Sequence, residues 1–146
     1  MGTIQLPPDF KEFLKLLNSR NVEYLLIGGY AVGYHGYPRP TGNLDLWIST
    51  TRENAERALA VLQEFGFSCS VELLQQENQV VRMGISPFRL KILTTIDGVT
   101  FGDCYAERVH GELDGVEVNI ISLRRLRENK KASGRSKDIA DLENLP

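Results

Sequence analysis

Residues 39–48, RPTGNLDLWI, place one carboxylate, Asp45, between apolar neighbours on an expected strand. A carboxylate in that setting is typically a metal ligand or a catalytic group. Alternate residues of a strand face the same side, so Asn43 is expected beside Asp45, but its amide carries no charge. Asp45 therefore needs chemical partners from other parts of the chain. The competing interpretation is a structural aspartate that caps a loop.

A glycine pair lies upstream of this strand. The run YLLIGG ends an expected buried strand at Gly28 and Gly29, and an expected short helix follows at once. Glycines let backbone N–H groups approach a phosphate closely, and the N-terminus of a helix adds partial positive charge. Together with carboxylates that hold divalent cations, this pattern is typical of phosphoryl or nucleotidyl transfer. A tight turn without a ligand is the alternative for the glycine pair.

The rest of the sequence predicts the elements that must position these residues. Hydrophobic periodicity indicates helices over residues 8–19, 30–37, 51–66, 100–109, 123–132 and 136–145, with Thr51 and Ser122 as N-caps. Strands are expected over residues 22–29, 44–49, 79–85 and 88–96, and in a hairpin over residues 110–122 that turns at Asp114 and Gly115. Because helices and strands mix without strict βαβ alternation, the expected fold class is α/β or α+β, a mixed β-sheet flanked by helices. We predict one domain over residues 1–146, with C-terminal helices from about residue 122 to 146 packed on it.

Composition argues against several functional classes. The 146 residues are 42% hydrophobic and 25% charged, as in an ordinary soluble domain. A net charge of −2 gives no global field for nucleic acid or a membrane surface, and no apolar run approaches the roughly 20 residues of a membrane span. The N-terminus has neither the basic nor the apolar region of a signal peptide. Cys69 and Cys104 form no metal-binding motif and are expected to be free thiols in the cytoplasm.

The segment YLLIGGYAVGYHGYPRPTGNLDLWI resembles the nucleotidyltransferase superfamily that includes polymerase beta-like and minimal nucleotidyltransferases. With ILTTIDGVTF and ISLRRLRENKKASGRSKDIADLENL, it is more closely similar to small bacterial proteins related to AbiEii-type toxins of toxin–antitoxin and phage-defence systems. The resemblance implies the nucleotidyltransferase fold. It also implies Mg²⁺-dependent transfer of a nucleoside monophosphate from an NTP to an RNA or protein acceptor, with a cognate antitoxin as a partner.

The same resemblance assigns roles to individual residues. Gly28 and Gly29 match the phosphate-facing glycines, and Asp45 matches the second of three metal-binding aspartates. Asn43 stands at the first of these positions, and Lys91, in RLKIL, stands at the third. Two of the three metal-binding carboxylates are thus absent.

This departure predicts impaired catalysis. The ammonium of Lys91 is expected to reach Asp45 and to occupy the space of a metal ion. It would oppose a cation there, because two unit charges about 4 Å apart interact by about 4 kcal/mol at an effective dielectric constant of 20. The alternative function is a pseudoenzyme module that binds a nucleotide or a partner without metal.

The loop before Asp45 adds two candidate nucleotide ligands. Arg39, between two prolines, is suited to a phosphate because a guanidinium can bind it through two parallel hydrogen bonds. Thr41 lies in the same loop and is predicted to bind the nucleotide with Arg39. A solvated loop arginine is the alternative.

The main basic run, LRRLRENKKASGRSKD, is by default the solvated face of a helix. The resemblance favours Lys130 and Arg135 as ligands of the triphosphate or of an RNA acceptor, since family members carry a lysine and an arginine in this block. Asp138 and Asp141 are then expected to be structural partners of those cations.

Overall fold

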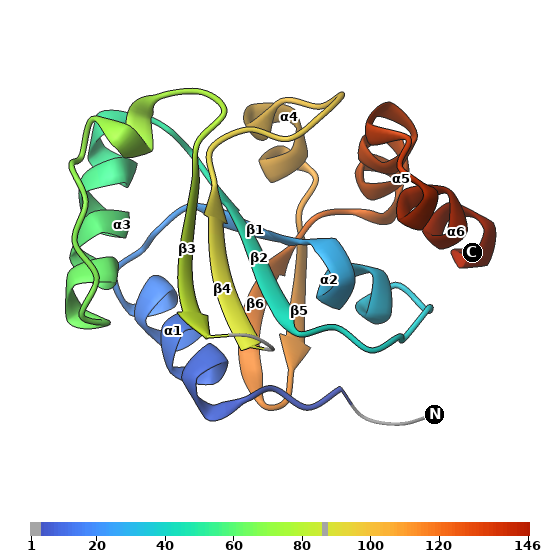
Figure 1. The fold of residues 1–146 in the computed structure, drawn as a ribbon, viewed down its shortest axis with the longest axis horizontal. Coiled ribbons are helices and arrows are strands. Elements are labelled where there is room, and N and C mark those ends of the chain that lie inside the picture. The colour runs from blue at the N-terminus through green and yellow to red at the C-terminus, as the bar shows by residue number, and fades with distance from the viewer. Residues whose placement is uncertain (1–3, 86–87) are drawn as a thin grey trace.

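The computed structural model describes residues 4–85 and 88–146, which form a mixed sheet with helices on both faces (Figure 1). The strands are β1 (Tyr24–Ile27), β2 (Asn43–Ile48), β3 (Val80–Ile85), β4 (Phe88–Leu93), β5 (Val109–Leu113) and β6 (Val116–Ile120). The helices are α1 (Pro8–Ser19), α2 (Gly28–Tyr34), α3 (Arg52–Glu64), the 3-10 turn η1 (Leu73–Gln75), α4 (Phe101–Ala106), α5 (Leu123–Ser133) and α6 (Ser136–Asn144).

Strand directions make this sheet mixed. The six strands lie in the order β3-β4-β2-β1-β6-β5. β1 runs antiparallel to β2 but parallel to β6, and β2 runs parallel to β4. The outer pairs, β3–β4 and β5–β6, are antiparallel. The predicted mixed β-sheet flanked by helices is therefore confirmed.

The two faces of the sheet have different covers. Buried side chains such as Leu44 and Leu46 form one face, under α1 and α3. On the other face, Phe101 of α4 packs edge to face against Trp47, with ring centroids 5.2 Å apart. Because Asp45 alternates with Leu44 and Leu46, it shares the face of Trp47. Asp45 therefore lies on the side of the sheet on which α4 packs, and it shares a pocket with residues of the C-terminal helices.

Local sequence signals set the ends of these elements. The hydroxyl groups of Thr51 and Ser122 each accept a hydrogen bond from a backbone N–H three residues later and so cap α3 and α5. The β5–β6 hairpin turns at Asp114 and Gly115, whose φ angles of 49° and 80° are both left-handed. Gly134, with a φ of 62°, ends α5 before α6 begins. These caps, the hairpin and the helix break agree with the predictions.

Some boundaries differ from the predictions. The first strand ends at Ile27, and Gly28, with a φ of 71°, already begins α2. A residue with a side chain would be strained in this left-handed backbone, so the glycine makes the change from strand to helix. β4 ends at Leu93, because its partner strand β3 starts only at Val80, opposite that residue. The expected turn at residues 86–87 lies outside the described residues.

A membrane span was not expected. Within residues 4–85 and 88–146, the structure has no helix that is both long and apolar enough to cross a bilayer.

Candidate active site

Strand register aligns three charged residues across the sheet. Arg82 of β3 pairs with Lys91 of β4, and Lys91 pairs with Asp45 of β2. Paired residues on adjacent strands face the same side of a sheet. The row continues through Ile27 of β1 to Gly28 at the start of α2. These five residues form one wall of a pocket of about 370 Å³, called the Asp45 pocket below.

The opposite wall comes from the C-terminal helices. Lys130 of α5 and Arg135, the residue before α6, line the pocket. With the two cations of the strand row, the lining holds four positively charged side chains. Two aspartates line it, Asp45 and Asp97. The balance of charge on the walls is therefore positive, as an anionic ligand requires.

Asp45 has few partners. Its Oδ1 atom is buried and has no hydrogen-bond partner. Burial raises the pKa of this carboxyl above its ordinary value, and the charges of Lys91, Lys137, Lys130 and Arg135 oppose that rise. Within the described ranges no ion pair of 4.0 Å or less joins Lys91 to Asp45. The expectation that the Lys91 ammonium reaches Asp45 is therefore wrong. The two residues are register partners and share a pocket, but their charged ends lie apart and interact only through space.

The glycine pair lies against both parts of the site. A Cβ atom at Gly28 would collide with Oδ2 of Asp45. A Cβ atom at Gly29 would come within 2.7 Å of Oγ1 of Thr41 and 3.3 Å of a terminal nitrogen of Arg39. Either position thus requires glycine because another side chain needs the space.

An ionic network connects the loop before β2 to the C-terminal helices. Arg39 donates two hydrogen bonds to Asp141, of 2.8 and 2.9 Å, and Lys130 lies 3.2 Å from the same carboxylate. Lys130 also lies 3.1 Å from Asp138, which Arg135 contacts at 2.8 Å. Burial by itself would raise the pKa of Asp138 and of Asp141, but hydrogen bonds from these cations lower both. The two aspartates are the cations' partners, as expected from the sequence.

The predicted site residues divide between two pockets. The Asp45 pocket holds Gly28, Asp45, Lys91, Lys130 and Arg135. A second pocket, of about 400 Å³, holds Gly29, Arg39 and Thr41. Asn43 lines neither of them. The consecutive glycines therefore face different spaces, and the structure does not bring all of the predicted nucleotide ligands to one surface.

Sequence reasoning missed the two other charged residues of the Asp45 pocket, Arg82 and Asp97. Arg82 lies in QVVRMGI, where alternation indicates a strand but gives no register against RLKIL. Asp97 lies in the turn after β4, and its carbonyl oxygen accepts a hydrogen bond from Asn129 of α5. The sequence carries no signal for that long-range contact.

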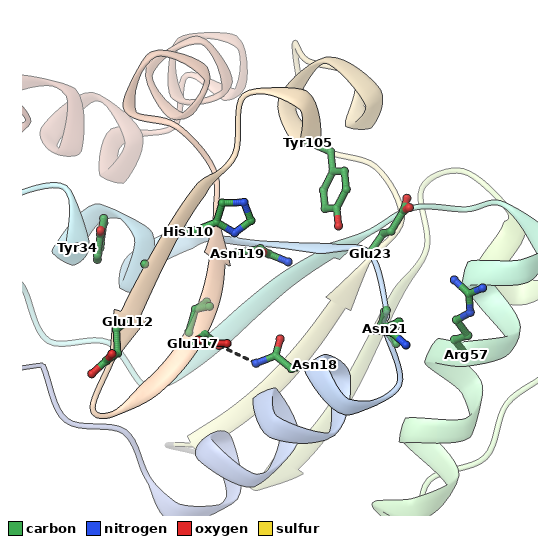
Figure 2. A pocket seen from close by; sticks show the side chains of 13 residues that line it. Asn18, Asn21, Glu23, Tyr34, Arg57, Tyr105, His110, Glu112, Glu117 and Asn119 are labelled. Carbon is green, nitrogen blue, oxygen red and sulfur yellow. Dashed lines mark hydrogen bonds between the residues drawn. The ribbon is translucent and has the colours of Figure 1, made fainter.

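A larger cavity, of about 980 Å³, lies at the other end of β1 (Figure 2). Its walls include Glu23, which precedes β1, whereas Gly28 follows that strand. Glu117, Tyr105 and His110 also line it. None of the predicted site residues lies in these walls, so the cavity is separate from the Asp45 pocket.

The residues of the Asp45 pocket do not fit the magnesium ions that the resemblance implies. Mg²⁺ takes oxygen ligands, usually one or two carboxylates together with phosphates of the substrate. In the described part of the chain, no group of three or more His, Cys, Asp or Glu side chains could hold a metal ion. Lys91 and Arg82 further oppose a divalent charge beside Asp45.

The sheet, the glycine pair that begins α2 directly after β1, and the carboxylate on β2 are typical of a nucleotidyltransferase fold. The chain is similar to a Thermotoga maritima protein described as a candidate nucleotidyltransferase, with a TM-score of 0.62 and 14% identity, over 96% of this chain and 94% of that one. It is also similar to ANT(2'')-Ia in complex with adenylyl-2''-tobramycin, with a TM-score of 0.59 and 17% identity, over 92% of this chain and 83% of that one. At these identities the likeness concerns the fold.

Sequence comparison gives the family. The profile of the aminoglycoside-2''-adenylyltransferase family matches residues 9–145. This protein belongs to that family, and its predicted place in the nucleotidyltransferase superfamily is confirmed. No curated protein matches the chain.

Proposed function

We propose that this protein binds a nucleoside triphosphate in the Asp45 pocket and transfers nucleotides poorly or not at all. The observation that carries the proposal is the strand register. It places Lys91, not a third carboxylate, directly beside Asp45, and it places the amide of Asn43 two residues away along β2. The pocket keeps charge for holding phosphates but lacks the carboxylates for metal-assisted transfer.

The chemistry of the walls supports binding more than transfer. In nucleotidyl transfer an acceptor hydroxyl attacks the α-phosphorus and pyrophosphate leaves, so the site must neutralise the phosphates and take up the proton. Lys91 and Arg135 can neutralise phosphate charge. Among the aligned strand residues, Asp45 alone could accept a proton. Lys91 carries a positive charge and cannot take up that proton, and the further carboxylates for metal-assisted transfer are missing. Together these features account for the impaired transfer that we propose.

The acceptor that we propose is an RNA end or a protein hydroxyl. ANT(2'')-Ia is known in complex with adenylyl-2''-tobramycin. An aminoglycoside is a polycation, and the positive charges of Arg82 and Lys91 in the lining of the Asp45 pocket would oppose it. The resemblance to AbiEii-type toxins supports RNA or protein as the acceptor, and it supports a cytoplasmic role with a cognate antitoxin as partner.

Metal-independent binding without any transfer is the second candidate. It corresponds to a pseudoenzyme module that holds a nucleotide or docks a partner. Its support is the direct alignment of Lys91 with Asp45. The two candidates share the ligand and differ in whether restoring the two missing acids brings nucleotide transfer back.

Restoring the missing acids tests the proposal. The parent, the double variant Asn43→Asp/Lys91→Asp and the control Lys91→Met are incubated with radiolabelled NTPs, Mg²⁺, and RNA or protein acceptors. We expect little incorporation by the parent or by the control, and at least about a tenfold increase for the double variant, which regains three carboxylates. The control removes the cation without adding a ligand.

The outcomes separate the candidates. Parent incorporation equal to that of the double variant would contradict impairment. If both proteins bind ATP by calorimetry and neither transfers it, the binding module is favoured. If the parent does not bind any NTP, the proposed function is wrong.

A further inference from the structure

Arg82 and Lys91 are the uncommitted cations of the Asp45 pocket. Lys130 has only 5% of its side chain exposed and is held by Asp138 and Asp141. Arg135 is more exposed but is paired with Asp138. By contrast, within residues 4–85 and 88–146, neither Arg82 nor Lys91 makes an ion pair within 4.0 Å. These two therefore supply the charge that is free to meet a ligand.

Their position is set by the sheet and not by flexible loops. Arg82 and Lys91 are register partners on β3 and β4, and Lys91 is the register partner of Asp45 on β2. In an antiparallel pair such as β3 and β4, directly opposed residues have Cβ atoms about 4.5–5.5 Å apart. The two cations thus form a short positive row that leads away from the single carboxylate. Such a row matches a chain of consecutive phosphates.

We infer that Arg82 and Lys91 make the Asp45 pocket a site for a nucleoside triphosphate free of divalent metal, so that Mg²⁺ competes with binding instead of assisting it. This inference rests on the proposed function and adds the form of the ligand. A Mg²⁺–triphosphate complex presents less negative charge to the two side chains and brings a divalent cation toward them. The uncomplexed triphosphate retains its full charge for both.

The opposite wall supports the same selectivity. Four cationic side chains line the pocket against two aspartates. The carboxylates of Asp138 and Asp141 are already satisfied by Lys130, Arg135 and Arg39. A magnesium ion that arrived with the nucleotide would find Asp45 and Asp97 as the carboxylates of the lining, and the positive charges of Arg82 and Lys91 would oppose it there.

Binding measured with and without magnesium tests the inference. Calorimetry is carried out with ATP and with inorganic tripolyphosphate, each in EDTA and in excess MgCl₂. We expect both ligands to bind in EDTA and MgCl₂ to weaken each by about tenfold or more. Arg82→Gln should weaken binding in EDTA by about tenfold, and Arg82→Lys should restore most of it. Arg57→Gln is the matched control, because Arg57 is an exposed arginine that lines the separate large cavity.

Each outcome has a distinct meaning. If Mg²⁺ strengthens ATP binding, or if Arg82→Gln behaves like Arg57→Gln, the inference is overturned while nucleotide binding stands. If ATP and tripolyphosphate both fail to bind with and without Mg²⁺, the inference and the proposed function fail together. Thermal unfolding of each variant by circular dichroism verifies that a loss of binding is not a loss of fold.

Discussion

Replacing Lys130 by methionine should strongly destabilise the protein. The ammonium of Lys130 lies 3.1 Å from Asp138 and 3.2 Å from Asp141, and side-chain exposure is 5%, 0% and 1% for the three residues. Methionine keeps most of the volume but leaves two buried carboxylates with less positive charge. Removing one partner of a buried ion pair typically costs about 3–5 kcal/mol. For a chain of this size that loss corresponds to a decrease in Tm of about 6–20 °C.

Urea unfolding at pH 7 measures the effect, with Lys131→Met as the control. Lys131 is exposed on the same helix, so its substitution should change the free energy of unfolding by less than about 0.5 kcal/mol. The two variants have the same change in charge and side-chain type. The difference between them therefore isolates the buried network.

The pH dependence supplies a second measurement. In the folded parent the pKa values of Asp138 and Asp141 lie below the ordinary value of 3.8, so these groups stabilise the fold above that pH. The stabilisation is lost as the pH falls through the lowered folded-state values. Without Lys130 the pKa values of the two aspartates are lowered less, so the difference in the free energy of unfolding between parent and variant should narrow below about pH 4. A difference in the free energy of unfolding that stays constant with pH would refute the reasoning. A Lys130→Met variant as stable as Lys131→Met would refute it as well.

Two further predictions concern the Asp45 pocket. Gly28→Ala should lower the free energy of unfolding by about 1–3 kcal/mol, because the φ of Gly28 is left-handed. The loss should be greater than for the control Gly66→Ala, since Gly66 has a similar φ of 82° but its added Cβ would meet open space. Equal losses in urea unfolding would argue against the collision with Asp45. Asp45→Asn should raise Tm at pH 8, because burial raises the pKa of Asp45 and disfavours its charged form. The gain in Tm should vanish as the pH falls below about 4, where the carboxyl is neutral in the folded and the unfolded protein. A lower Tm for the variant at pH 8 would contradict this explanation.

Local sequence patterns predicted some residues of the Asp45 pocket but not how these residues are arranged. The glycine pair and Asp45 were found from the sequence because each depends on its own neighbours: a strand ends, a helix begins, and the next strand carries an acid. The space that each glycine faces was not predictable in this way. Gly28 lies against Asp45, and Gly29 lies against Thr41, because β1 and β2 pair in one particular register.

The burial of Lys130 was likewise not predictable from the sequence. Its place in a basic run and the family resemblance suggested a ligand of the triphosphate. In the structure it lines the Asp45 pocket, but its ammonium is bound by two buried aspartates from α6. The sequence names those aspartates as partners, yet burial of all three groups depends on how α5 and α6 pack.

The sequence by itself determined the kinds of element, the caps at Thr51 and Ser122, and the hairpin at Asp114 and Gly115. These features follow from residue types a few positions apart. Only the tertiary structure aligned Arg82 with Lys91 and Asp45, and only it separated the pocket of Arg39 from that of Asp45. Strand register and helix packing bring together residues that are distant in the chain. The free energy of a particular register or packing arrangement depends on the whole set of contacts and not on any single segment.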